Sequence, residues 1–192
     1  EQIVKQNKQN IVIEKPTSTA LINKANEVLM TQQLEARQCS FATSQTPSHQ
    51  GVVINEIAWM GSVSSANDEW IELKNSASAT LDLKNWQLVD EGENIKVNLS
   101  SLSTTKISPG QFLIFERTDD ASAPGVQASF VYTGALSNTG EGLRLFDSQC
   151  TLIDEALAHS DWPAGESSSR KTMERNADLT WYTSQNAGGT PK

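Results

Sequence analysis

The 192-residue chain is poor in the residues that most catalytic and metal sites use. It has two histidines, His49 in a polar stretch and His159 in a loop beside Asp161, and neither a G-x-S-x-G motif nor a histidine pair at metal-ligand spacing. A Ser-His-Asp arrangement stays open in so serine-rich a chain, but no nucleophile stands beside a recognisable base. We therefore predict no enzyme activity, no catalytic residue, no metal ligand and no cofactor.

Long apolar runs are also missing. No stretch approaches the roughly 18 apolar residues of a membrane-spanning helix, so no transmembrane segment is expected in this chain. The first residues lack the charged and apolar regions of a signal peptide. If the protein is exported, its signal was removed before Glu1.

Basic residues are scarce in the larger part of the chain. Residues 51–192 contain ten Lys and Arg against nineteen Asp and Glu, a net charge of −9, whereas residues 1–50 carry +1. An acidic surface repels phosphate backbones. Nucleic acid is therefore not expected as a partner.

The first fifty residues differ from the rest in amino-acid composition and in the spacing of their apolar residues. Residues 1–16 are rich in Gln, Asn and Lys, which is typical of a flexible lead-in. Apolar residues at helical spacing then predict a helix over about 18–38, capped by one of the hydroxyl residues at 17–19. Residues 40–50 form a polar linker. We therefore divide the chain into an N-terminal extension, 1–50, and a domain, 51–192.

Period-two patterns separated by Gly, Pro and Asn predict about eight short strands in the domain. The turn Ser108-Pro109-Gly110, which we expect to be of type II, leads into one of them, and that strand is predicted to be central. The predicted strands are 52–59, 68–74, 81–88, 95–99, 112–115, 130–132, 143–146 and 152–157. So many short strands, with no helix between them, indicate an antiparallel β-sandwich.

Several segments carry a more specific pattern. They are INEIAWMGS (54–62), DEWIELKN (68–75), LDLKNWQLVD (81–90), ISPGQFLIFERTDD (107–120) and the closing GTPK. They resemble the lamin-tail domain, a module at the tail of nuclear lamins that also occurs in bacterial envelope and secreted proteins. The resemblance runs from about Gly51 to Lys192 and is closest to the bacterial branch. It implies an all-β, immunoglobulin-like antiparallel β-sandwich, here with a short helical N-terminal extension, and a scaffold that does not fix a function.

Within this pattern, eight residues are interpreted as structural: Asn55, Glu56, Trp59, Asp68, Glu69, Trp70, Glu72 and Trp86. The three tryptophans fall inside strand patterns and are expected at the core or its edge. The three glutamates are expected to accept backbone or arginine hydrogen bonds, with Arg144 or Arg175 as possible partners.

Exposed aromatic residues would offer stacking faces for sugar rings. The candidates are Trp162, Trp181 and Tyr182. Trp162 precedes Pro163 in a loop-like stretch, so we expect its ring to be the most exposed.

Two acidic turns raise the question of calcium, which prefers carboxylate oxygens. One contains Asp90, Glu91 and Glu93, and the other contains Asp119 and Asp120. Neither turn has the spacing of a known calcium loop. We favour solvated turn carboxylates.

Cys39 precedes the domain and Cys150 lies in its last predicted hairpin turn. Two unrelated thiols in a reducing cytosol are one interpretation, and a disulfide in an oxidising compartment is the other. A free thiol in a turn would be exposed to oxidation, so we favour the disulfide. It predicts an extracytoplasmic protein, at the cell surface or secreted.

Together these observations favour a non-enzymatic binding or display module of a bacterial cell-envelope or secreted protein, attached to a protein or an envelope polymer. The alternative is a carbohydrate-binding module that uses the exposed aromatics. Contact with DNA, which the family name brings to mind, is disfavoured by the charge of −9.

Overall fold

A computed structural model of the chain describes residues 19, 21–27, 37–123 and 125–192. The chain divides into two compact units, 1–37 and 38–192. In the first, residues 19 and 21–27 are helical, within the range predicted for a helix, while the predicted lead-in and residues 28–36 lie outside the described residues. None of the helices in the described residues has the length and hydrophobicity needed to cross a bilayer.

The second unit is built from short strands, as its period-two patterns predicted. Its strands are β1 (Val52–Ala58), β2 (Trp70–Asn75), β3 (Leu81–Asp82), β4 (Gln87–Asp90), β5 (Lys96–Asn98), β6 (Lys106–Ile107), β7 (Phe112–Arg117), β8 (Phe130–Tyr132), β9 (Gly142–Phe146), β10 (Leu152–Leu157), β11 (Lys171–Arg175) and β12 (Trp181–Ala187). One 3-10 turn, Leu99–Ser101, follows β5. The unit is therefore all-β among its described residues.

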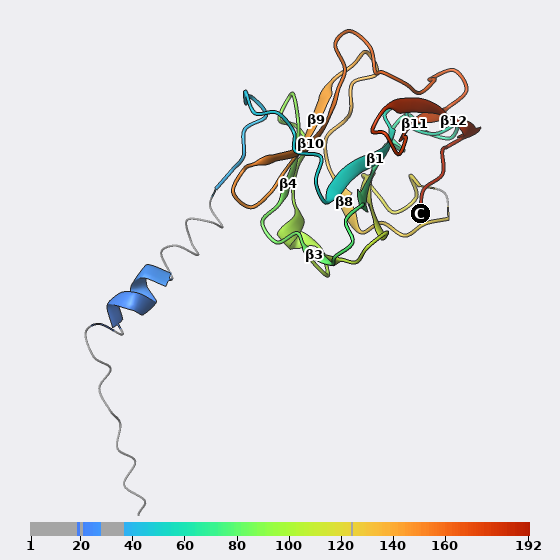
Figure 1. The fold of residues 1–192 in the computed structure, drawn as a ribbon. Helices are drawn as coiled ribbons and strands as arrows, with labels where there is room; N and C mark the ends of the chain where they lie inside the picture. The colour runs from blue at the N-terminus through green and yellow to red at the C-terminus, as the bar shows by residue number, and fades with distance from the viewer. Residues whose placement is uncertain (1–18, 20, 28–36, 124) are drawn as a thin grey trace, which may run out of the picture. The chain divides into compact units, whose positions relative to one another are not determined.

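The strands form two main sheets that pack as a sandwich, and a small third one (Figure 1). One sheet has six strands in the order β12-β11-β1-β2-β7-β8, and the other has four in the order β10-β9-β4-β5. The pair β3–β6 stands apart. The predicted immunoglobulin-like sandwich is confirmed, except that β8 pairs with β7 in parallel rather than antiparallel. The predicted central strand, β7, lies inside the six-stranded sheet.

The core fills the space between the two main sheets. Ile57 and Ile71 of the six-stranded sheet and Leu88 and Leu145 of the four-stranded sheet are fully buried in one cluster. β1 is buried along nearly all of its length, because it is central in its sheet and covered on both faces. The apolar density of residues 52–59 is typical of such a doubly covered strand.

The predicted strand 81–88 is wrong, because two strands of different sheets occupy its ends. β3 pairs with β6, and β4 pairs with β5 and β9. Between them, Asn85 adopts a left-handed φ of 63°, which turns the chain from one sheet to the other. The bend at Asn85 therefore separates β3 from β4.

β11 and β12 were missed by the strand prediction. β12 has the sequence WYTSQNA, in which polar residues predominate and Ser184 is the buried position. An edge strand buries little, so it carries a weak period-two signal. These two strands extend the larger sheet by two positions beyond β1.

Residues 38–50, predicted as part of the N-terminal extension, belong to the second unit. The backbone N–H groups of Ser48 and His49 donate to the carbonyls of Leu152 and Ile153 at 3.2 and 2.7 Å. These bonds lay the segment along β10. The polar composition that predicted a linker reflects its exposed position on the sandwich.

Candidate functional site

A row of carboxyl groups crosses the six-stranded sheet on the face opposite the core. Glu174 of β11 and Glu72 of β2 are the cross-strand neighbours of Glu56 in β1, and Tyr182 of β12 is the neighbour of Glu174. The three glutamates are buried. Cross-strand neighbours lie about 5 Å apart, so the three acidic groups stand side by side on three successive strands, with Glu56 in the middle.

Residues 189–192, which we call the strap, cover this row. The N–H and Oγ1 of Thr190 donate to the Glu56 carboxylate at 2.9 and 3.1 Å, and the N–H of Lys192 donates to Glu72 at 2.9 Å. Gly189 allows this approach, because it has a φ of +76° and a Cβ there would lie 2.0 Å from Glu56 Oε1. The closing sequence GTPK therefore caps the two buried glutamates.

Neighbouring side chains donate further hydrogen bonds to the row. Thr172 Oγ1 donates to Glu56 at 2.5 Å, Asn55 Nδ2 donates to Glu72 at 2.6 Å, and the Tyr182 hydroxyl donates to Glu174. Burial nevertheless raises the pKa of Glu56 and of Glu72 to about 7 from an ordinary value of 4.5, against the lowering effect of these bonds. The bond to Glu174 raises the pKa of Tyr182 to about 12.

The protein is expected to lose stability as pH rises from about 4.5 to about 7. The folded state holds the protons of Glu56 and Glu72 up to about pH 7, whereas the unfolded chain releases them near 4.5. Below pH 4.5 both groups are protonated in the folded and the unfolded state, and their contribution to stability is complete. As the pH rises from about 4.5 to about 7, that contribution is lost. We expect a loss of up to about 3 kcal/mol for each of the two glutamates, measured by urea unfolding at several pH values.

The variant Glu56→Gln/Glu72→Gln should flatten this pH dependence, because a neutral amide resembles the protonated acid. Glu91→Gln is the matched control, since Glu91 is exposed and lies outside the row. A pH dependence that is equal in both variants would contradict the assignment to the row.

Glu69 is the predicted structural glutamate that has an arginine partner, but the arginine is neither of those expected. Its Oε1 accepts from Arg117 at 2.9 Å and its Oε2 from the Leu136 N–H at 2.8 Å. Burial raises its pKa. The predicted partners are wrong: Arg144 pairs with Glu155, and Arg175 pairs with Asp154.

Asp154 is a polar centre that the sequence analysis did not single out. Its carboxylate is fully buried and accepts from Arg175 at 2.8 Å, from the Ile54 N–H at 2.7 Å, and faces His49 Nδ1 at 2.7 Å. The Arg175 guanidinium also lies 4.0 Å from the centre of the Trp181 ring. A charged residue amid the apolar pattern of 152–157 was the available signal. The network joins β10, β1, β11 and the segment before β1.

The remaining structural residues have local roles. Asp68 accepts from Ser62 Oγ, which shapes the small-residue loop between β1 and β2. Trp70 packs with Ala58, Ile114 and Ala123 on the outer face of the sheet. Trp86 is partly buried against the main core, and Trp59 lies within that core.

The prediction that Trp162 is exposed is wrong. The residue is 7% exposed, and its ring stacks on Trp59 with ring centres 6.3 Å apart and donates through Nε1 to the Ser137 carbonyl at 2.7 Å. Trp181 is half-buried, while Tyr182 is exposed. Adjacent residues of a strand point to opposite faces, so Trp181 and Tyr182 do not form one platform.

The acidic turns are held by internal contacts. Asp90 is buried and its Oδ1 accepts from the Ile95 N–H at 2.6 Å, Glu93 pairs with Lys96 at 2.7 Å, and Asp120 accepts from the Ala128 N–H at 2.6 Å. In the part of the chain that the structure describes, no three His, Cys, Asp or Glu side chains converge as a metal site would require.

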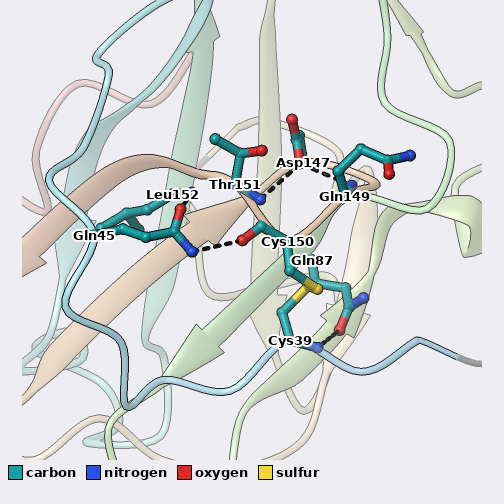
Figure 2. Close-up of a disulfide and its surroundings, with 8 residues drawn as sticks. All are labelled: Cys39, Gln45, Gln87, Asp147, Gln149, Cys150, Thr151 and Leu152. Carbon is teal, nitrogen blue, oxygen red and sulfur yellow. Dashed lines mark hydrogen bonds between the residues drawn. A yellow bond between two sulfur atoms is a disulfide. The ribbon is translucent and has the colours of Figure 1, made fainter.

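Cys39 and Cys150 form the predicted disulfide, with sulfurs 2.02 Å and Cα atoms 5.3 Å apart. Figure 2 shows the polar contacts around it. The Cys39 N–H donates to Gln87 Oε1 at 3.0 Å, and the Gln45 amide bridges the Cys150 carbonyl and the Leu152 N–H at 3.0 and 2.9 Å. The bond therefore fastens the segment 38–50 to the hairpin between β9 and β10. Disulfides are typical of oxidising compartments.

Comparison with known proteins places this sandwich in a family. No curated protein matches the chain. The profile of the Lamin Tail Domain family matches residues 45–159, which ends before β11, β12 and the strap, although the resemblance in sequence was expected to reach Lys192. The family is an immunoglobulin-like, non-catalytic domain family associated with protein binding. The match covers more than half of the chain, which therefore belongs to the Lamin Tail Domain family.

Proposed function

We propose that the protein is a non-enzymatic binding or display module of a bacterial cell-envelope or secreted protein, which attaches to a protein or an envelope polymer outside the cytoplasm. The observation that carries the proposal is the Cys39–Cys150 disulfide. It supports an oxidising compartment and clamps the entry of the chain onto the sandwich. A fixed position of the entering chain suits a domain that must hold a binding partner or a displayed segment in a fixed place.

The distribution of polar groups is consistent with a scaffold. The buried carboxylates of Glu56, Glu72 and Asp154 are engaged by donors from the protein itself. Their chemistry is used to hold strands, the strap and the entry segment together. Binding is then left to the exposed strands and loops.

The proposal is tested with the oxidised full chain immobilised and exposed to solubilised envelope fractions, and in parallel by co-sedimentation with purified cell-wall polymer. We expect saturable binding in one of the two assays. The Cys39→Ser/Cys150→Ser variant serves as a comparison for the clamp. The absence of saturable binding in both assays would contradict attachment.

A glycan array decides the carbohydrate alternative, for which Tyr182 is the remaining exposed candidate. A stacking role would survive Tyr182→Phe, which keeps the ring, and would be lost in Tyr182→Ala. We expect no glycan binding that follows this pattern. If it is observed, the carbohydrate-binding alternative replaces attachment.

The protein is expected to bind duplex DNA no better than an acidic control protein of similar size does, because residues 51–192 carry a net charge of −9. Fluorescence anisotropy at physiological salt measures this. A salt-sensitive dissociation constant below about 1 µM, tighter than ordinary non-specific binding, would contradict the prediction.

A further inference from the structure

A groove of about 510 Å³ opens between the β1–β2 loop, the β7–β8 loop and the end of β12. Its volume lies in the range of ligand-binding clefts. Two carboxylates, three serines and several small apolar groups line it, and none of the described residues that line it is Lys or Arg. The lining includes Ser62, Val63, Asp68, Asp119, Ala121 and Ser122.

The β1–β2 loop holds an apolar side chain of this groove in solvent. Val63 is 82% exposed, more than any other large apolar residue in the described part of the chain. The Ser62 N–H donates to the Ser65 carbonyl at 2.8 Å, and Ser62 Oγ accepts from the N–H groups of Ser64 and Ser65 at 2.9 and 3.2 Å. These bonds fix the loop in the conformation that presents Val63, so a partner can cover the side chain without first ordering the loop.

The negative charge of the groove is not balanced by the basic side chains that contact the same loops. Asp68 and Asp119 line the groove. Arg117, at the start of the β7–β8 loop, is paired with Glu69. Arg170 donates to a backbone carbonyl of the β1–β2 loop. The groove is therefore complementary to a positively charged group.

A buried carboxylate lies behind one wall of the groove. The N–H groups of Ser122 and Ala123 donate to Glu116 Oε2 at 2.6 and 3.1 Å. Glu116 is fully buried, and its Oε1 has no hydrogen-bond partner among the described residues. Burial raises the pKa of Glu116, and the charges of Asp120 and Asp119 add to the rise. An unpartnered carboxylate oxygen next to an acidic groove favours a cationic ligand.

We propose that this groove binds a lysine or arginine side chain of a polypeptide partner, with the charged group toward Asp68 and Asp119 and an apolar neighbour in the partner against Val63. The proposal rests on the proposed function, attachment to a protein, and adds the chemistry of the partner.

The arrangement of the carboxylates suits a basic side chain better than a metal ion. In the part of the chain that the structure describes, no three Asp, Glu, His or Cys side chains converge on one point. A metal ion needs several ligands around it. An ammonium or guanidinium group on a flexible side chain needs only one or two carboxylates, to which it donates charge-assisted hydrogen bonds.

A peptide titration of the oxidised full chain, followed through its backbone amide signals by NMR, tests the proposal. The probe is an acetylated and amidated valine-lysine-valine peptide. We expect half-saturation near about 1 mM, the affinity of a small contact, with shifts at Val63, Ser122 and Gly188 of the groove. The same peptide with norleucine in place of lysine lacks the charge, and we expect it to bind about fivefold more weakly or worse.

Three variants separate the charge from the apolar contact. Asp119→Lys reverses a charge of the groove, and we expect it to weaken binding of the lysine peptide about tenfold. Asp161→Lys is the matched control, because Asp161 is exposed, does not line the groove and undergoes the same change in charge. Val63→Ser removes the apolar contact and should weaken binding of both peptides about threefold.

The proposal is overturned if the two peptides bind equally, if Asp119→Lys and Asp161→Lys have equal effects, or if the shifted signals lie outside the groove. Calcium chloride that shifts the same signals to saturation without peptide would assign the groove to a metal ion and also overturn it.

Attachment to envelope fractions, measured with Asp119→Lys, distinguishes this proposal from the proposed function. Attachment that the variant retains in full leaves the proposed function intact and overturns the groove as its site. If the unchanged protein attaches to nothing while the lysine peptide binds as expected, the proposed function fails and the site for a basic side chain stands.

Discussion

Removal of the Cys39–Cys150 disulfide is expected to lower the free energy of unfolding by up to about 4–5 kcal/mol. The two cysteines are 111 residues apart in sequence, and a closed loop of that length restricts the unfolded chain strongly. The folded state also loses the fixed position of the segment 38–50, whose hydrogen bonds to Gln87 and Cys150 depend on its place beside the hairpin. A loss of this size approaches the whole stability of a marginal domain.

The measurement is urea unfolding of the unchanged protein and of Cys39→Ser/Cys150→Ser, each with and without reductant. The reductant should destabilise the unchanged protein and leave the variant as it is. A difference below about 1 kcal/mol would show that the bond does not constrain the unfolded chain in this way.

The substitution Asp154→Ala is expected to cost about 3–5 kcal/mol, because it leaves a buried charge without its partner. The Arg175 side chain is 5% exposed and pairs with Asp154, and the buried N–H of Ile54 donates to the same carboxylate. Burial already lowers the pKa of Arg175, and Asp154 opposes that effect. Without the carboxylate, water can reach the guanidinium only if the packing of the surrounding strands loosens.

Asp161→Ala is the control for Asp154→Ala, because it removes the same charge from an exposed loop. Asp154→Asn should fall between the two, since the amide oxygen still accepts a hydrogen bond but carries no charge. The stabilities are compared by chemical unfolding at pH 7. Equal effects of Asp154→Ala and Asp161→Ala would mean that Arg175 does not depend on this partner.

The disulfide and the Asp154 network act at the two ends of the same segment. Cys39 is fastened to the hairpin between β9 and β10, and His49 reaches Asp154 of β10. The chain therefore enters β1 from a fixed position. If force reaches the domain through its N-terminal side, the disulfide bears it before the first strand of the core does.

Local patterns in the sequence were enough to determine the fold class. Residues 52–59 were predicted as a strand, their apolar density is typical of one covered on both faces, and β1 is such a strand. Gly110 was placed at the turn position that needs positive φ, and its φ is 74°. Each of these properties depends on residues close together in the chain, so the sequence carries it directly.

Which side chains contact one another was decided by the tertiary structure alone. Glu56 accepts from Thr190, 134 residues away, and Glu69 takes Arg117 instead of either arginine expected. The burial of Trp162 depends on Trp59, which lies in a distant part of the chain. The sequence determined that the glutamates and tryptophans stand in strands and loops of a sandwich. Which groups meet depends on how the sheets and the strap close over one another, and period-two patterns carry no information about that closure.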